Sequence, residues 1–163
     1  MRPGRHVAPP PAVRRALEEI FGQDGLSLGQ VRVIEHSLFA RLHGRAIATT
    51  RRRRIFLRGS AADFFSNPEL MLHEYCHVLR QWEPGSLTTL KYVREWLRHG
   101  YWNNRFEIEA RDFAREHAGR FSEMLRKAAA EQQRAPSLHE ITRRTPRINL
   151  GTDPPQPSSD SRR

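Results

Sequence analysis

Apolar residues recur every three or four positions in four stretches of the chain, and this spacing predicts four helices. They cover residues 12–21, about 67–82, 86–100 and about 104–130. The second has the clearest boundaries, because Asn67 can cap its first turn, Pro68 suits the first helical position and Pro84 cannot continue the helix. Ser86 is expected to cap the third helix, and Gly100 is expected to end it.

Shorter apolar runs predict a small amount of β structure. Residues 31–34 predict one strand, and residues 46–49 and 55–57 predict the two strands of a hairpin. A helical turn over residues 37–43, ending at Gly44, is expected between them. The expected fold class is therefore α+β, with a short sheet or hairpin packed on the helices.

The two ends of the chain differ in composition from its middle. Residues 1–11 are basic and rich in proline, and residues 131–163 hold Pro, Ser, Gln and Arg with few large apolar side chains. Such segments bury too little apolar surface to offset the entropy lost on ordering. We therefore expect one domain over residues 12–130 between two disordered tails.

Charge and cysteine usage narrow the environment and the partners. Lys and Arg number 28 against 18 Asp and Glu, a net charge of +10 that favours contact with phosphate, acidic lipid headgroups or an acidic protein. The single cysteine cannot form an intramolecular disulfide, which fits a reducing compartment. The sequence contains no apolar run of about 18 residues, and its first residues lack the apolar core of a signal peptide. A soluble cytoplasmic protein is expected.

Four consecutive arginines, Arg51, Arg52, Arg53 and Arg54, separate the two hairpin strands. They can protect an edge strand from aggregation, or they can contact an acidic partner. Nucleic-acid binding is disfavoured, because Phe56 is the only aromatic residue close to the cluster that could stack on a base.

The strongest chemical signal is the segment His73-Glu74-Tyr75-Cys76-His77 in the second predicted helix. Residues four apart share one helix face, so His73 and His77 can present two imidazoles to one zinc ion. Glu74 lies about 100 degrees round the helix from His73, where it can reach a water molecule without being a ligand. Cys76 is expected to be a small core residue and not a ligand.

A third protein ligand is expected in the fourth helix. The candidates there are Glu107, Glu109, Asp112, Glu116 and His117. Glu107 lies at the border of the apolar face beside Ala110 and Ala114, whose small side chains would let two helices approach closely. Glu107 is therefore the expected ligand, and Glu109, which lies farther round the helix, is the second choice.

Other aromatic and histidine side chains have weaker assignments. The candidates for stabilising an oxyanion are Tyr101, His99 and Tyr92, with Tyr101 preferred. The three tryptophans are expected to pack the helices together, and they are Trp82, Trp96 and Trp102.

The motif and the segment Glu107-Ile108-Glu109-Ala110-Arg111-Asp112-Phe113-Ala114 together resemble the gluzincin metallopeptidases. The likeness covers roughly residues 13–125. It is nearest to the small gluzincin-like domain, largely uncharacterised, of bacterial proteins associated with contractile injection systems. The resemblance implies a minigluzincin-like fold and makes Glu107 the ligand of a Glu-x-x-Ala pattern. It also shows a departure, because many gluzincins have Asp or Asn at the position of Arg111, where it holds a zinc histidine.

These features predict a zinc-dependent peptidase that acts on a peptide or protein, with Glu74 as general base. The arginine cluster would favour an acidic substrate. An alternative function is a non-catalytic, zinc-stabilised module that binds an acidic protein or nucleic acid. The sequence leaves the substrate, the oligomeric state and the pathway open.

Overall fold

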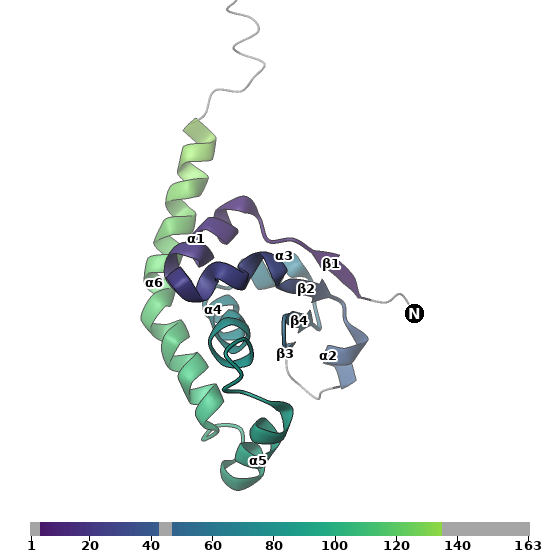
Figure 1. The fold of residues 1–163 in the computed structure, drawn as a ribbon. Coiled ribbons are helices and arrows are strands. Elements are labelled where there is room, and N and C mark those ends of the chain that lie inside the picture. The colour runs from purple at the N-terminus through teal and green to yellow at the C-terminus, as the bar shows by residue number, and fades with distance from the viewer. Residues whose placement is uncertain (1–3, 43–46, 135–163) are drawn as a thin grey trace, which may run out of the picture.

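The computed structural model describes residues 4–42 and 47–134, and it confirms an α+β fold in which a four-stranded sheet lies beside several helices (Figure 1). The strands are β1 (Arg5–Val7), β2 (Arg32–Glu35), β3 (Ala48–Arg51) and β4 (Arg54–Leu57). The α-helices are α1 (Pro11–Phe21), α2 (Leu38–Leu42), α3 (Ala61–Phe65), α4 (Pro68–Cys76), α5 (Thr89–His99) and α6 (Arg105–Arg134). A 3-10 helix, η1 (Gly22–Gln30), follows α1, and a π-helical segment, η2 (His77–Trp82), follows α4.

The sheet has the strand order β1-β2-β4-β3, so β3 lies at an edge. β1 and β3 pair antiparallel with their neighbours, whereas β2 and β4 are parallel and place Val33 opposite Ile55. Both of these side chains are fully buried on the core face. Phe56 alternates to the other face, where its ring contacts Phe39 of α2 at 4.7 Å between centroids. The predicted strands are thus present, while residues 43–46, which include Gly44 and the predicted start of the hairpin, lie outside the described residues.

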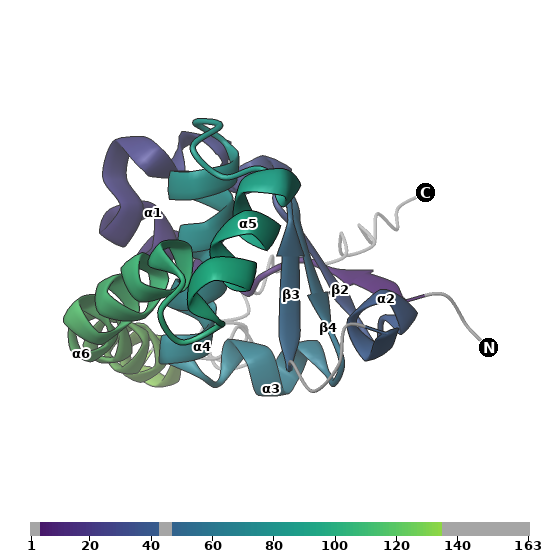
Figure 2. The same ribbon diagram turned by 90° about the horizontal axis from the view of Figure 1, so that it is seen from below.

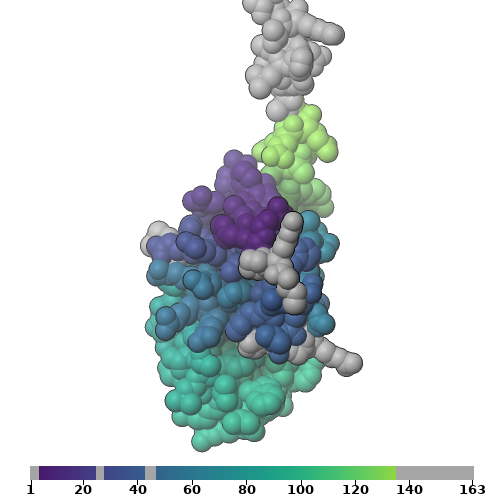
Figure 3. Space-filling view, turned by 90° about the vertical axis from the view of Figure 1, so that its right-hand side faces the viewer, coloured from purple at the N-terminus to yellow at the C-terminus, as the bar shows by residue number. Residues whose placement is uncertain are grey.

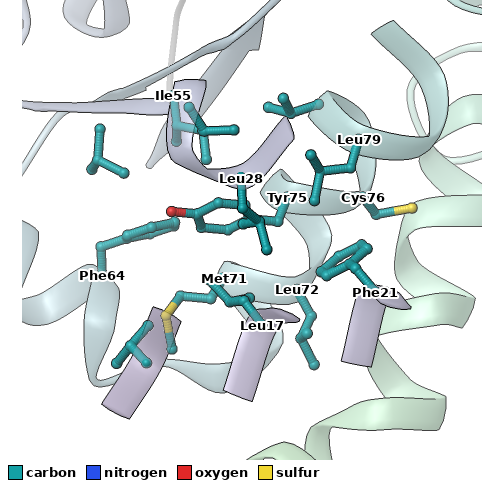
Figure 4. Packing of buried hydrophobic residues seen from close by; sticks show 14 of the residues in the cluster. Leu17, Phe21, Leu28, Ile55, Phe64, Met71, Leu72, Tyr75, Cys76 and Leu79 are labelled. Atoms are coloured by element: carbon teal, nitrogen blue, oxygen red, sulfur yellow. The ribbon is translucent and has the colours of Figure 1, made fainter. Parts of the chain in front are cut away.

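The core is built around α4, which contributes Met71, Leu72 and Tyr75, each 0 or 1% exposed. Figure 4 shows the ring of Tyr75 among side chains from α1, β4 and α3. Cys76 is also fully buried in this cluster, as expected, and burial raises the pKa of its thiol to about 12. A neutral, inaccessible thiol is a packing residue.

Helix α6 packs along α4 and α1 through a face of alternating large and small residues. Phe113 stacks on Phe21 of α1 at 4.8 Å between ring centroids, and Ala110 and Ala114 are buried beside α4. The far end of α6 projects beyond the body of the molecule (Figures 1 and 3). No helix in the described ranges, the 30-residue α6 included, has the length and apolar content needed to cross a membrane.

The helix predicted for residues 67–82 begins as expected and changes geometry in its second half. The side chain of Asn67 accepts a hydrogen bond of 3.0 Å from the amide of Leu70, which caps α4. After Cys76 the turn widens, and the amide of Glu83 bonds to the carbonyl of Val78, five residues back, at 2.9 Å. The chain then leaves the helix at Pro84, as the sequence predicts.

Two predictions about α5 are wrong. Thr88 caps this helix, accepting a hydrogen bond from the amide of Lys91, whereas the hydroxyl of Ser86 donates to the carbonyl of Gln81. The tryptophans at 96 and 102 do not pack helices together, because they are 50% and 72% exposed. The reason is position: α5 lies at one end of the molecule, between α6 and β3, and it has no buried residue (Figure 2).

The predicted disordered tail over residues 1–11 is wrong for its described part. Residues 5–7 form β1, and α1 already begins at Pro11. Composition does not reveal the two long-range contacts of this segment: β1 pairs antiparallel with β2, and the guanidinium of Arg5 contacts the buried carboxylate of Glu35 at 2.6 and 2.7 Å. Of the second predicted tail, residues 131–134 continue α6, and residues 135–163 lie outside the described part of the chain.

Glu35 ties β1 and α3 to the sheet, and its removal should destabilise the fold. Its other oxygen accepts a 2.8 Å hydrogen bond from the amide of Ala61, and this bond and the contact with Arg5 lower the pKa of the carboxyl group. A lowered folded-state pKa means that the carboxylate stabilises the fold above its unfolded-state pKa. That contribution is lost as the pH falls through the folded-state pKa. Glu35→Gln should therefore lower the free energy of unfolding at neutral pH, with a difference from wild type that shrinks in acid.

Denaturant unfolding at several pH values measures this effect. Glu116→Gln, a substitution of an exposed residue on α6, provides the matched control and should change little. Equal stability of wild type and Glu35→Gln at neutral pH would contradict the role assigned to this carboxylate.

Candidate metal centre

Helix α4 and the first residue of η2 place two imidazoles on the same side of the chain. His73 and His77 are one turn apart, and their Nε2 atoms lie 3.1 Å from each other. Their rings meet edge to face with centroids 4.7 Å apart. Their neighbours Met71, Leu72, Tyr75 and Cys76 are buried in the core, so the helix that presents the imidazoles is anchored on its opposite side.

Helix α6 brings a carboxylate to the same point. Glu107 is 4% exposed, with one oxygen 3.3 Å from Nε2 of His73 and the other 3.6 Å from Nε2 of His77. The side chains of Glu107, His73 and His77 form the one three-residue group in the described ranges whose ligand atoms all lie within 4.8 Å of each other. The first-choice ligand from the sequence is therefore the carboxylate that the fold brings to the histidines.

The spacing of these three groups fits a tetrahedral zinc ion. Zinc bonds to imidazole nitrogen and carboxylate oxygen are about 2.0–2.2 Å long, which places neighbouring ligand atoms of a tetrahedron roughly 3.3–3.6 Å apart. The two imidazole nitrogens lie 3.1 Å apart, slightly closer than this range, and the two oxygens of Glu107 lie within it, one 3.3 Å from His73 and the other 3.6 Å from His77. With three protein ligands, a tetrahedral ion keeps a fourth position for water or substrate.

The electrostatics of the cluster also favour a cation. Burial raises the pKa of Glu107, but the adjacent imidazoles of His73 and His77 outweigh it and hold that pKa below the ordinary value. Burial lowers the pKa of His77, yet contact with Glu107 raises it overall. One oxygen of Glu107 is buried and makes no hydrogen bond within the described part of the chain. A buried carboxylate with an unbonded oxygen is costly, and a metal ion between the three groups would remove that cost.

Two tyrosines surround the carboxylate of Glu107. The phenol of Tyr92 in α5 donates a 2.8 Å hydrogen bond to the oxygen that faces His77. Burial and the charge of Glu107 raise the pKa of both Tyr92 and Tyr101, so both phenols remain protonated donors. The third oxyanion candidate from the sequence, His99, is instead an exposed side chain 3.9 Å from Glu95.

Glu74 lines the same cleft. It is 6% exposed, and one of its oxygens accepts a hydrogen bond from the hydroxyl of Thr50 in the edge strand β3. This bond fixes the carboxylate in place and leaves its other oxygen available. Thr50 carried no signal in the sequence, because its role depends on a contact between residues 24 positions apart.

Gln81 is a second residue that sequence reasoning missed. It is fully buried, and its side-chain oxygen lies 2.7 Å from Nδ1 of His77, on the far side of the ring from the candidate metal position. Its amide nitrogen donates to the carbonyl of Phe106 at 2.9 Å and to the carboxylate of Glu109 at 3.1 Å. Glu109, the second-choice ligand, therefore contacts the support of a histidine and does not reach the ligand group.

Arg111 has a structural contact in place of the expected support of a histidine. Its guanidinium donates a hydrogen bond to the carbonyl of Trp102 and lies over the ring of that residue at 5.2 Å. It thereby holds the loop between α5 and α6, which carries Tyr101.

The arginine cluster divides into separate roles. Arg53 forms a two-bond ion pair with Glu83 at 2.6 and 2.9 Å, which ties the turn to the end of η2. Arg51 lines the cleft, while Arg52, with a positive φ of 52°, occupies the turn. All four arginines are exposed.

A cleft of about 950 Å³ opens over the candidate metal position. One wall is the edge strand β3, with Thr49 and Thr50, and the floor carries His73, Glu74, His77 and Glu107. The opposite wall is largely aromatic, formed by α5 and the loop that follows it, namely by Tyr92, Val93, Trp96, Tyr101 and Trp102. Such a concave, mostly apolar space with a few polar groups at its base is typical of a ligand site.

One known family model matches part of the chain. Residues 8–85 match the family described as the eCIS core domain, whose name refers to extracellular contractile injection systems. The match covers slightly less than half of the chain and contains His73, Glu74, His77 and Gln81. It ends before α5 and α6, so Tyr92, Tyr101 and Glu107 lie outside it. No curated protein and no solved structure matches the chain.

The geometry separates the two acidic residues that the sequence left as alternatives. Glu107→Gln removes the charge that faces both histidines, and we expect a loss of zinc affinity of more than about 100-fold, beyond that of a supporting residue. Glu109→Gln should retain one zinc per chain, because Glu109 does not reach the ligand group. Elemental analysis after dialysis, with competition against a chelator, measures both. Zinc lost from the Glu109 variant and kept by the Glu107 variant would reverse the assignment.

Proposed function

We propose that the protein is a zinc-dependent peptidase in which His73, His77 and Glu107 hold the metal. The observation that carries the proposal is the convergence of two imidazole nitrogens and a buried carboxylate, at 3.1–3.6 Å from one another, at the base of an open cleft. The resemblance of the same residues to the gluzincin pattern supports it. When bound, zinc supplies Lewis acidity, polarising the scissile carbonyl and lowering the pKa of the attacking water.

Glu74 is the proposed general base. Its free oxygen would take a proton from water as the carbon–oxygen bond forms, and it would deliver that proton to the leaving amine as the carbon–nitrogen bond breaks. The hydrogen bond from Thr50 holds the carboxylate through both transfers. Since Thr50 belongs to β3, the edge of the sheet positions the base directly.

Tyr101 is the proposed donor to the developing oxyanion. Its phenol is protonated, it lines the cleft, and at 45% exposure it remains accessible to substrate. Tyr92 has a different proposed role, because its hydroxyl already donates to Glu107. It orients a ligand and does not need to contact the substrate.

The shape of the cleft suggests an extended peptide as the substrate. A peptide lying along β3 can form main-chain hydrogen bonds with the unpaired side of this edge strand. The aromatic wall opposite would accept large apolar side chains, and Arg51 would favour an acidic residue at one end. The match to the eCIS core domain suggests that a protein of a contractile injection system is a partner or substrate.

A non-catalytic zinc-stabilised module is the alternative. The observation that favours it is the exposure of all four arginines at the β3–β4 turn, of which Arg51 lines the cleft, because such a basic surface can bind an acidic protein or a nucleic acid without any chemistry. Both functions require zinc, so metal content does not distinguish them. Peptide hydrolysis by the zinc-loaded protein distinguishes them, because only the peptidase would cleave.

Substitution of Glu74 tests whether the protein is a peptidase with this residue as its base. Glu74→Gln should keep one zinc per chain and lower kcat/KM by about 10²- to 10⁴-fold, since removal of a positioned base costs a factor of that size. Cleavage of a peptide library by freshly metallated protein, read by mass spectrometry, supplies the substrate for this measurement. Glu69→Gln, a substitution of an exposed residue on the same helix, is the matched control and should retain activity.

Undiminished cleavage by a zinc-retaining Glu74→Gln variant would refute the proposed base. An inactive but metallated wild-type protein that binds an acidic partner in a salt-sensitive manner would favour the alternative.

A further inference from the structure

Gln81 is a fully buried amide whose hydrogen bonds are satisfied on both sides. It lies in η2, four residues after His77, and bridges the outer edge of that imidazole to α6. Neither the motif nor the general-base mechanism uses it. A buried amide that is bonded at both ends has a defined orientation, and that orientation determines whether each neighbouring group must donate or accept a hydrogen bond.

The contacts of Gln81 fix which end of its amide faces His77. Its nitrogen lies 2.9 Å from the carbonyl oxygen of Phe106 and 3.1 Å from a carboxylate oxygen of Glu109. Both of these groups are acceptors, so the reverse orientation would place oxygen against oxygen at two contacts. The amide nitrogen must face α6, and the amide oxygen must face Nδ1 of His77.

An amide oxygen only accepts hydrogen bonds, so the partner atom in His77 must carry a hydrogen. At 2.7 Å from that oxygen, Nδ1 of His77 is therefore the protonated nitrogen of the ring. In the neutral imidazole the lone pair then lies on Nε2, which faces His73 and Glu107. Neutral imidazole in water prefers the opposite tautomer, with hydrogen on Nε2, in which the lone pair would point away from the candidate metal position.

We propose that Gln81 is a positioning residue that sets His77 in the tautomer able to bind a metal, and that Glu109 fixes the orientation of Gln81. This inference rests on the proposed zinc site and deepens it. The group that holds His77 is thus a neutral amide, that of Gln81, four residues later in the same continuous helical segment. Arg111, at the position where many gluzincins carry a supporting Asp or Asn, is bonded to Trp102 and leaves this role to Gln81.

The first test needs neither zinc nor activity. Long-range proton–nitrogen correlation spectra of histidine-labelled, metal-free protein distinguish the two tautomers of a neutral imidazole, with His77 assigned by substitution and the pH set high enough to neutralise it. The wild-type ring is expected as the Nδ1–H tautomer. In Gln81→Met, which is similar in volume but cannot accept this hydrogen bond, the ring should shift toward Nε2–H.

The second test measures zinc affinity by chelator competition. Gln81→Met should bind zinc about 10- to 100-fold more weakly than wild type, which is the usual effect of losing a group that orients a metal ligand. Gln81→Glu keeps an acceptor for His77 but sets an oxygen against both the carbonyl of Phe106 and the carboxylate of Glu109, so it should also bind weakly. Adding Glu109→Gln to that variant restores a donor at the second of these contacts and should recover part of the affinity, while the contact with Phe106 stays unfavourable.

The rescue separates positioning from a general loss of packing, because a merely structural defect at residue 81 would not be relieved by a change of donor on α6. Glu116→Gln, an exposed change on the same helix, is the control and should alter neither reading. An Nε2–H tautomer in the wild type, or an unchanged tautomer and affinity in Gln81→Met, would overturn the role of Gln81. If the wild type binds no zinc, the proposed function fails, while the tautomer in metal-free protein still decides the present inference.

Discussion

The close packing of α4 against α6 is the contact on which the candidate site depends. Ala110 and Ala114 let the two helices approach, and the buried aromatic side chains of α1 and α6 hold them together on the far side of the core. This approach buries Glu107 and places its two carboxylate oxygens 3.3 and 3.6 Å from the Nε2 atoms of His73 and His77. A buried carboxylate must be compensated, and the groups around it here are two imidazole nitrogens and the phenols of Tyr92 and Tyr101.

The elements that form the core therefore also carry the residues of the candidate site. Helix α4 packs against the core with one face and lines the cleft with the other, and Thr50 of the sheet bonds to Glu74, the proposed base. The π-helical segment begins at His77, so the helix changes its geometry at the residue proposed as a zinc ligand. Two elements that line the cleft have exposed sides, since β3 is an edge strand and α5 has no buried residue.

Local signals in the sequence were sufficient for the elements that carry the site. The cap at Asn67 and the helical spacing of His73 and His77 predicted α4, and the small residues on α6 selected Glu107 over Glu109 by helix geometry alone. The α+β class followed from the short apolar runs between the helices. Each of these inferences uses residues within about two turns of one another, where side-chain direction is set by the backbone period.

Features that depend on distant contacts could not be predicted. Strand β1 pairs with β2, and its Arg5 contacts Glu35, thirty residues away, whereas the basic composition around Arg5 indicated a disordered tail. The amphipathic pattern of α5 suggested a packed helix, yet its apolar side faces the cleft and solvent, since no other described element covers that end. Gln81 belongs to no recognisable sequence motif, because its role depends on contacting both His77 and Glu109 of α6 in the folded structure.

We expect the cluster of His73, His77 and Glu107 to bind zinc through nitrogen and oxygen donors. X-ray absorption at the zinc edge, on wild-type protein loaded with one equivalent of zinc, tests this most directly. The spectrum should show nitrogen and oxygen donors at about 2.0–2.2 Å and the outer-shell scattering of two imidazoles. A sulfur donor at about 2.3 Å, which would place Cys76 on the metal, or the absence of imidazole scattering would contradict it.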